Sequence, residues 1–223
     1  MSRTVVVLRP EPGNAATMAR LAREGLAGRA LPLFAVHALP WKARAADHDA
    51  LILTSANAVR FGGEGLATLR TLPVYAVGMR TAEAASMAGF WIAHVGRTGK
   101  EALVAAAEAR GVRRALHLAG REHGLTVNGP ISTVAICYAS DPVDVPAPAI
   151  DALAGQVALV HSPRAAERLA ALVDAYRLAR DRVAIAAISD AAGAAAGGGW
   201  RTVAVARRPT DADLVAAVHR LAD

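Results

Sequence analysis

Short apolar runs alternate along this chain with segments whose apolar residues recur every three or four positions. The first pattern is typical of strands buried on both faces of a parallel sheet, and the second of amphipathic helices. The predicted strands are Thr4–Leu8, Arg29–Phe34, Asp49–Thr54, Val74–Val77, Trp91–Val95, Ala115–Leu118, Ile131–Tyr138, Val157–His161, Val183–Ile188 and Thr202–Ala206. Helical patterns separate most of these strands. The regular alternation predicts an α/β fold with parallel sheets.

Part of this pattern occurs twice. LILTSANAVRF, from Leu51, has a counterpart in ALVHSPRAAERL, from Ala158, so Ser55 and Ser162 are equivalent at an offset of 107 (162 − 55). A second match places Gly78 over Ser189 and continues without a gap at an offset of 111 (189 − 78). Because three successive strand–helix units occur twice, the sequence predicts two similar lobes and not a solenoid of many small repeats.

The second copy lacks two of the strands that a five-stranded sheet needs, and the unmatched N-terminal unit is able to supply them. We therefore expect a discontinuous lobe formed by residues 1–34 plus 143–223 and an inserted lobe formed by residues 41–134. Residues 35–40 and 135–142 are expected to be paired linker strands. The predicted fold class is two similar three-layer, parallel-sheet lobes joined by a two-stranded linker, with one lobe discontinuous.

The composition and charge of the chain exclude some classes of protein and favour others. The chain has 223 residues, of which 54% are hydrophobic, so it is able to bury a core. The formal net charge of +6 comes mostly from arginine and favours a small polyanion, because no basic run marks a nucleic-acid arm. Cys137 is the only cysteine, which excludes an intrachain disulfide and a cluster of thiolate metal ligands.

Several familiar signatures are missing from the sequence. It contains no dinucleotide-binding fingerprint, no phosphate-binding P-loop and no nucleophile elbow, and its histidines lack metal-ligand spacing. The apolar core of the N-terminus is too short for a signal peptide, and no apolar run is long enough to span a membrane. A cytoplasmic location is expected.

The carboxyl ends of the strands are the expected binding edge of such sheets. Hydroxyl groups, glycines and arginines gather there beside predicted helix starts, where unpaired amides and the helix dipole favour anions. If both lobes direct these ends into one cleft, they form an array of carboxylate or phosphate sites. The alternative for Ser55, Ser162 and Ser189 is a role as helix N-caps alone. Tyr138 ends the return crossing, where its hydroxyl either donates a proton to a leaving hydroxyl or packs at the hinge.

A set of phrases carries a family resemblance: VVVLRPEP, DALILTSANAV, VYAVGMRTAEAASMAGF, AGREH, ICYASDP, ALVHSPRAAERL, AIAAISDAAGAAA and ARRPTDADLVAAV. In this order they make the chain resemble the uroporphyrinogen-III synthase family over essentially its whole length. The resemblance implies a cofactor-free lyase of haem-precursor synthesis. The family's substrate is hydroxymethylbilane, a linear tetrapyrrole with eight carboxylates. Its closure to uroporphyrinogen III loses water and inverts the terminal pyrrole ring.

The resemblance also implies roles for particular residues. Tyr138 matches the tyrosine that handles the leaving hydroxyl, and no metal site is implied. Substrate-binding residues are expected at Arg9, Thr54, Ser55, Asn57, Gly78, Thr81, Gly120, Arg121, Ser162 and Ser189. One departure is Ala191-Ala192-Gly193, where relatives often have threonine followed by alanine, so a hydroxyl contact is lost there. The implied partner is a small polycarboxylate, with delivery by the upstream bilane-forming enzyme as an option; a monomer without nucleic-acid or membrane partners is expected.

Three other functions remain open at this point. The chain is alternatively a non-enzymatic two-lobed binder of a small polyanion. A nucleotide-dependent α/β enzyme would have to hold phosphates on a loop such as Gly96–Lys100, which lacks P-loop spacing. A nucleic-acid binder is favoured only by net charge, and a steep salt dependence with duplex DNA would reveal it.

Overall fold

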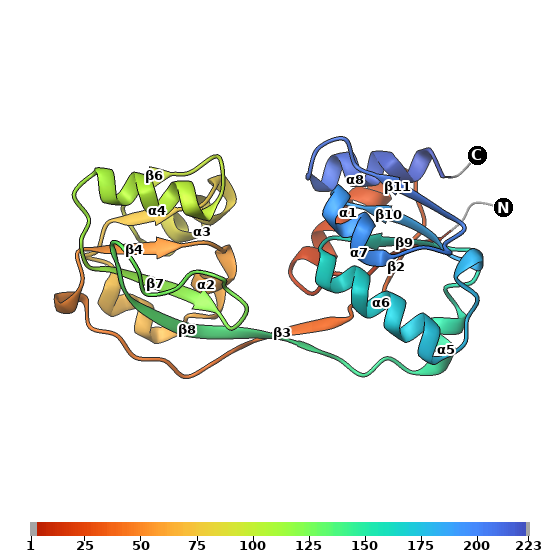
Figure 1. Ribbon diagram of the computed structural model, residues 1–223, viewed down its shortest axis with the longest axis horizontal. Coiled ribbons are helices and arrows are strands. Elements are labelled where there is room, and N and C mark those ends of the chain that lie inside the picture. The colour runs from red at the N-terminus through yellow and green to blue at the C-terminus, as the bar shows by residue number, and fades with distance from the viewer. Residues whose placement is uncertain (1–3, 222–223) are drawn as a thin grey trace. The chain divides into compact units, whose positions relative to one another are not determined.

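The computed structural model of the protein describes residues 4–221. Its chain divides into two compact units, a discontinuous lobe made of Met1–Ala35 with Asp141–Asp223 and an inserted lobe made of Val36–Ser140. Each lobe contains a sheet with helices on both faces (Figure 1). The expectation of an α/β fold with two similar lobes, one of them discontinuous, is confirmed.

The discontinuous lobe is built on a five-stranded sheet with the order β11-β10-β9-β1-β2, in which all neighbours are parallel. The strands are β1 (Val5–Val7), β2 (Gly28–Ala30), β9 (Val157–Val160), β10 (Ala184–Ala187) and β11 (Thr202–Val205). The helices are α1 (Gly13–Arg23), α5 (Ala147–Asp151), α6 (Pro163–Ala175), the 3-10 helix η3 (Arg180–Arg182), α7 (Asp190–Ala196) and α8 (Asp211–His219).

Side chains that alternate between the two faces of this sheet form a separate hydrophobic core on each face. Val6, Ala158 and Ile185 face α6 and α7, whereas the neighbouring Val5, Val7 and Leu159 pack with residues of α1 and α8. Successive side chains of a strand point to opposite faces, so a strand covered on both faces must be apolar throughout. This requirement explains the uninterrupted runs VVV and VALV in the sequence.

The inserted lobe is built on a six-stranded sheet with the order β3-β8-β7-β4-β5-β6. The strands are β3 (Phe34–Ala38), β4 (Ala50–Leu53), β5 (Val74–Ala76), β6 (Ile92–Val95), β7 (Ala115–Gly120) and β8 (Ile131–Pro142). The helices are η1 (Ala45–Asp47), α2 (Ala56–Phe61), η2 (Glu64–Leu69), α3 (Met79–Met87) and α4 (Lys100–Ala109). Leu51 and Leu53 pack with α2, η2 and α3 on one face, and Ile52 packs with α4 on the other.

The two sheets share one topology once the strands are matched through the sequence repeat. β9, β10 and β11 of the discontinuous lobe correspond to β4, β5 and β6 of the inserted lobe, and each set occupies one end of its sheet. β1 and β2 then take the places of β7 and β8. The N-terminal strand–helix–strand unit therefore completes the second copy, as the strand count of the sequence predicts.

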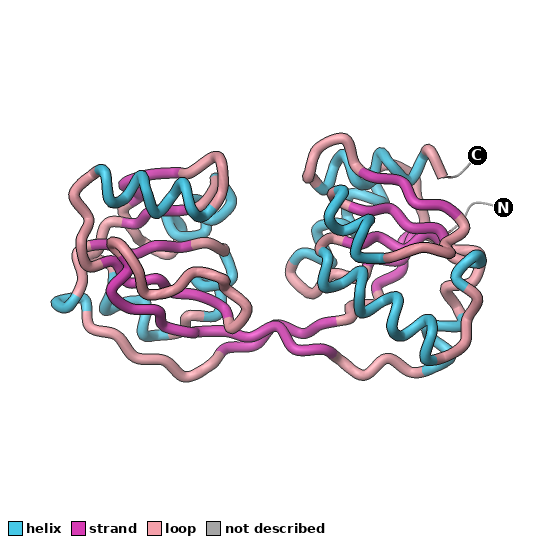
Figure 2. The backbone as a smooth tube through the Cα atoms, in the orientation of Figure 1, coloured by secondary structure: helices cyan, strands magenta, loops and turns pink. Residues whose placement is uncertain are grey.

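β3 and β8 run beside one another in the two connections between the lobes (Figure 2). Backbone hydrogen bonds join Leu39 N to Cys137 O at 2.8 Å and Val143 N to Leu33 O at 3.1 Å, an order that makes the pair antiparallel. The predicted strand Arg29–Phe34 is divided into β2 and the start of β3, because Pro32 between them has no amide hydrogen to donate. Within residues 4–221, no helix combines the length and the apolar character needed to cross a bilayer.

Candidate functional site

Each sheet reverses its strand order at one point, between β4 and β7 in the inserted lobe and between β9 and β1 in the discontinuous lobe. In open α/β sheets, ligands bind at the carboxyl ends of the strands on either side of this point. Thr54 and Ser55 follow β4, and Gly120 ends β7. His161 and Ser162 follow β9, and Arg9 follows β1. Five of the residues predicted from the sequence therefore lie at a reversal point, three in the inserted lobe and two in the discontinuous lobe.

A pocket of about 360 Å³ lies at this point of the inserted lobe. It brings together four of the predicted site residues: Thr54, Ser55, Gly120 and Tyr138. Its lining also includes Lys100, Glu122 and His123, which are not among the predicted substrate-binding residues. Lys100 begins α4, and its ammonium group donates to the His123 carbonyl oxygen at 3.3 Å. Side-chain donors therefore surround the pocket from α4, from β8 and from the loops that follow β4 and β7.

Tyr138 is half-buried at the wall of this pocket, next to Gly120 on the neighbouring strand. Its ring lies 6.3 Å from the ring of Phe61, centroid to centroid. Burial raises the pKa of the Tyr138 hydroxyl above its ordinary value, and a hydrogen bond with the Ser55 side chain offsets part of this rise. The hydroxyl therefore keeps its proton at neutral pH and is available as a donor.

The side chain of Thr54 contacts a buried histidine, His117. His117 Nε2 is 3.1 Å from Thr54 Oγ1, and the His117 ring meets the ring of His123 edge-on with centroids 5.5 Å apart. Burial, together with the neighbouring His123 and Lys100, lowers the pKa of His117 to about 4. The imidazole is therefore neutral at physiological pH.

The other predicted residues of the inserted lobe lie at helix starts around this sheet edge. Asn57 is in the first turn of α2, where its backbone N–H donates to Ser55 Oγ at 3.2 Å. Gly78 precedes α3, whereas the side chain of Thr81 in that helix is buried. Arg121 is exposed directly after β7, and its amide donates to the Tyr138 carbonyl oxygen at 2.9 Å.

Ser162 and Ser189 each precede a helix of the discontinuous lobe. Ser162 Oγ accepts a hydrogen bond from Ala165 N at 3.2 Å, and Ser189 Oγ accepts one from Ala192 N at 3.3 Å. Both residues are N-caps of their helices, α6 and α7. Since one hydroxyl oxygen satisfies an otherwise unpaired amide, these serines have a structural role whatever else they bind.

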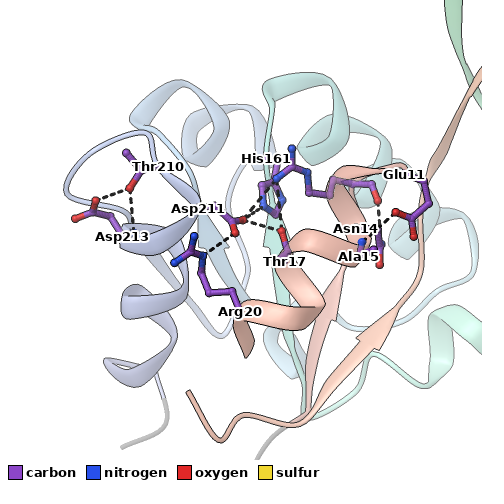
Figure 3. Close-up of polar contacts among 10 residues, drawn as sticks. Glu11, Asn14, Ala15, Thr17, Arg20, His161, Thr210, Asp211 and Asp213 are labelled. Atoms are coloured by element: carbon purple, nitrogen blue, oxygen red, sulfur yellow. Dashed lines mark hydrogen bonds and ion pairs between the residues drawn. The ribbon is translucent and has the colours of Figure 1, made fainter. Parts of the chain in front are cut away.

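Arg9 belongs to a polar cluster centred on Asp211. Figure 3 shows Thr17, Arg20 and His161 around the Asp211 carboxylate. The Asp211 carboxylate accepts hydrogen bonds from Thr17 Oγ1 at 2.7 Å and from Arg20 Nε at 3.0 Å. His161 Nε2 lies 3.0 Å from the same carboxylate, and Arg9 Nη1 lies 3.5 Å from it. Asp211, the first residue of α8, thus joins three parts of the lobe: Arg9 after β1, two residues of α1, and His161 after β9.

The protonation states of this cluster follow from its geometry. Burial raises the pKa of Asp211, but hydrogen bonds from His161, Thr17 and Arg20 outweigh this effect and hold the pKa well below its ordinary value. Burial lowers the pKa of His161 more than its hydrogen bond to Asp211 raises it. A neutral His161 donates through Nε2 to an ionised Asp211, and the two arginines leave the cluster with a net positive charge.

This cluster pairs His161 with a carboxylate, a contact that the sequence does not indicate. His161 and Asp211 are 50 residues apart in the chain, so their pairing leaves no local spacing signal. Among residues 4–221, no group of His, Cys, Asp or Glu side chains is arranged to hold a metal ion. Cys137 is buried, and burial raises the pKa of its thiol to about 12, so the thiol is protonated and inert at neutral pH.

Comparison with known proteins identifies relatives of this arrangement. A family model described as uroporphyrinogen-III synthase HemD matches residues 15–216. The crystal structure of uroporphyrinogen-III synthetase from Helicobacter pylori is similar at a TM-score of 0.67 and 16% identity, covering 98% of this chain and 99% of that chain. A mutant uroporphyrinogen III synthase from the extremely thermophilic bacterium Thermus thermophilus is similar at a TM-score of 0.55 and 16% identity, covering 98% and 97%. At this identity the structural likeness establishes the fold. No match was found among curated proteins.

Proposed function

Because the chain belongs to the uroporphyrinogen-III synthase family, we propose that it closes hydroxymethylbilane to uroporphyrinogen III. The observation that carries this proposal is the family match over residues 15–216, which includes β4 and β7 on either side of the reversal point of the inserted lobe. The reaction is proposed to proceed with loss of water and inversion of the terminal pyrrole ring. The overall change eliminates water and forms a carbon–carbon bond without net oxidation or reduction. We therefore assign the enzyme to the lyases and propose that it needs no cofactor.

Tyr138 is the proposed catalytic residue. The substrate hydroxyl leaves as water only when it gains a proton. The Tyr138 hydroxyl holds a proton at neutral pH, since the pKa of a tyrosine is ordinarily about 10 and burial raises it further here. The hydrogen bond with Ser55 and the close packing on Gly120 hold this hydroxyl at the pocket wall. Tyr138 would give this proton to the departing hydroxyl, and the tyrosinate that remains would regain a proton when ring closure releases one from the attacking pyrrole carbon.

Substrate binding is proposed to distribute over the strand ends and helix starts of both lobes. The proposed residues are Arg9, Thr54, Ser55, Asn57, Gly78, Thr81, Gly120, Arg121, Ser162 and Ser189. A substrate with eight carboxylates needs many donors, and helix-start amides together with arginines provide them. We expect binding to do most of the catalytic work, since the uncatalysed closure already gives the symmetric isomer. The enzyme has to hold the chain so that the inverted attack is the nearer one.

Three further proposals concern the setting of the reaction. We propose that the protein acts in the cytoplasm as a monomer, without nucleic-acid or membrane partners. Its substrate is a small polycarboxylate, and direct transfer from the bilane-forming enzyme upstream would protect it from uncatalysed closure. Gel filtration with and without that enzyme tests both the monomer and the transfer.

Product analysis tests the proposed activity directly. Freshly generated hydroxymethylbilane is incubated with the protein, the products are oxidised, and porphyrin isomers I and III are separated by chromatography. Isomer III in excess over a sample without enzyme is the expected result. A folded protein that yields only isomer I, at the uncatalysed rate, would overturn the proposal.

A further inference from the structure

His117 is a fully buried polar residue in the middle of the inserted lobe's sheet. It lies on β7 opposite Ile52 of β4, and its Nε2 atom contacts Thr54 Oγ1 at 3.1 Å. Its Nδ1 atom is buried and has no hydrogen-bond partner among residues 4–221. Among residues 4–221, the contact with Thr54 is therefore the one hydrogen bond that the His117 imidazole makes.

The unpartnered Nδ1 atom determines where the ring carries its hydrogen. A neutral imidazole has one N–H donor and one acceptor nitrogen. A buried N–H group without an acceptor is costlier and rarer than an acceptor with an unused lone pair. The hydrogen therefore resides on Nε2, which donates to Thr54 Oγ1. Because the Thr54 oxygen accepts this bond, its own hydrogen is left to point toward another acceptor.

Thr54 lines the pocket, so its hydroxyl hydrogen is able to point toward an acceptor there. His123 is held in a matching state, because its Nδ1 accepts a hydrogen bond from Leu125 N at 3.2 Å and leaves Nε2 as the donor. Lys100 adds an ammonium group to the same lining. Glu122 adds one carboxylate to this lining, but the hydroxyl, imidazole and ammonium donors outnumber it and suit a carboxylate ligand.

We infer that His117 is a positioning residue that orients the Thr54 hydroxyl as a hydrogen-bond donor to a carboxylate of the substrate. The inference rests on the proposed function for the identity of the substrate, but the orientation of Thr54 exists in the free protein. His117 itself does not line the pocket, and it acts only through Thr54.

The first test measures the tautomer in the free protein. Ring-nitrogen NMR of histidine-labelled protein, with the His117 signals assigned by their loss in His117→Gln, reports which nitrogen carries the hydrogen. We expect a neutral Nε2–H ring at about pH 7 that persists on acidification to about pH 5, and whose Nε2 signal shifts in Thr54→Val. A neutral Nδ1–H ring would overturn the inference.

The second test is kinetic and uses four variants of the wild-type enzyme. His117→Leu removes the donor at similar volume, and a roughly tenfold rise in KM for hydroxymethylbilane with little change in kcat is expected from losing one hydrogen bond to a charged group. His117→Gln places an amide N–H near the lost Nε2–H and should restore most of the affinity. Thr54→Val should raise KM by a similar factor, and adding His117→Leu to it should raise KM no further.

The two sets of results separate this inference from the proposed function. If the wild type forms no isomer III, the proposed function fails while the tautomer measurement still decides the orientation of Thr54. If isomer III forms but His117→Leu and Thr54→Val multiply their effects on KM, His117 does not act through Thr54. If His117→Leu loses affinity and His117→Gln does not recover it, packing and not the donor is responsible, and the inference is wrong.

Discussion

The ring of Tyr138 lies directly on Gly120. A Cβ atom on Gly120 would lie 2.4 Å from Tyr138 Cζ and 2.8 Å from the Tyr138 hydroxyl oxygen. The two residues face one another on β7 and β8, at a register shift in the pairing of these strands. Since no Cβ atom tolerates so short a contact, Gly120 is what allows the hydroxyl to reach the pocket.

Gly120→Ala should therefore separate activity from stability. The atoms in conflict belong to the free end of the Tyr138 side chain, so the ring should rotate away while the strands stay in place. We expect kcat to fall by about 10²-fold, the range lost when a general acid is removed, with only a small change in melting temperature. Gly198→Ala is the matched control, because no atom lies within 4 Å of its new Cβ. Wild-type kcat in Gly120→Ala would show that the position of the ring is not critical.

Tyr138→Phe tests the hydroxyl itself. The variant keeps the ring and its packing on Phe61 but removes the proton donor and the partner of Ser55. We expect kcat for isomer III to fall by about 10²-fold with KM within a few-fold of wild type, because the hydroxyl acts on the leaving group. Steady-state kinetics with isomer separation measures this change. Full turnover with unchanged substrate affinity would remove Tyr138 from the mechanism.

The fold could be predicted largely because each sheet is covered on both faces. Runs such as VVV and ALIL must then be apolar at every position, and they stand out against the amphipathic helices. The count of strands per copy was enough to assign the N-terminal unit to the second lobe. The boundary inside Arg29–Phe34 was missed because the apolar pattern continues across Pro32, where the pairing changes from β1 to β8.

The sequence could predict which residues share the pocket where they lie at or near the carboxyl ends of strands, whereas their roles stay a prediction. Thr54, Ser55, Gly120 and Tyr138 come from three separate segments and share one pocket, since the carboxyl ends of parallel strands meet at one edge. His117 was missed because it sits inside the apolar strand ALHLAG, where a lone histidine gives no sign of its partner. Asp211 was missed because Thr17 and His161 reach it across long sequence separations of 194 and 50 residues.

The capping serines provide a test that needs no substrate. Ser162→Ala and Ser189→Ala each remove a hydroxyl that satisfies a helix-start amide, and each should lower the free energy of unfolding by about 1 kcal/mol. Ser86→Ala, at an exposed position within α3, should change it by less than about 0.5 kcal/mol. Urea denaturation measures all three variants. If the serines also contact the substrate, KM should rise in the capping variants beyond any change seen with Ser86→Ala.

Asp211→Asn should destabilise the discontinuous lobe. The change removes the charge that pairs with Arg9 and Arg20 and weakens the bond to His161, so we expect a loss of about 2–3 kcal/mol at neutral pH. The folded-state pKa of Asp211 lies below its unfolded value of about 3.8, so this contribution is present above that pH and is lost as the pH falls through the folded pKa. Wild type and variant should therefore converge in acid. Asp181→Asn, an exposed position in η3, is the control, and an equal loss in both variants would contradict the assignment.

His117 should also make the free energy of unfolding depend on pH. Its effect should appear at higher pH than that of Asp211. Its pKa is about 4 in the folded protein and 6.5 in the unfolded chain, so below pH 6.5 the unfolded chain binds a proton that the folded protein does not. The free energy of unfolding should fall by about 3 kcal/mol through this group between pH 7 and pH 4, at about 1.4 kcal/mol per pKa unit. Denaturation of His117→Gln at both pH values should show a shallower decline than wild type, whereas His219→Gln, exposed at the end of α8, should follow wild type. An identical decline in His117→Gln and wild type would mean that His117 is protonated in the folded protein and that its ring is not the neutral donor to Thr54.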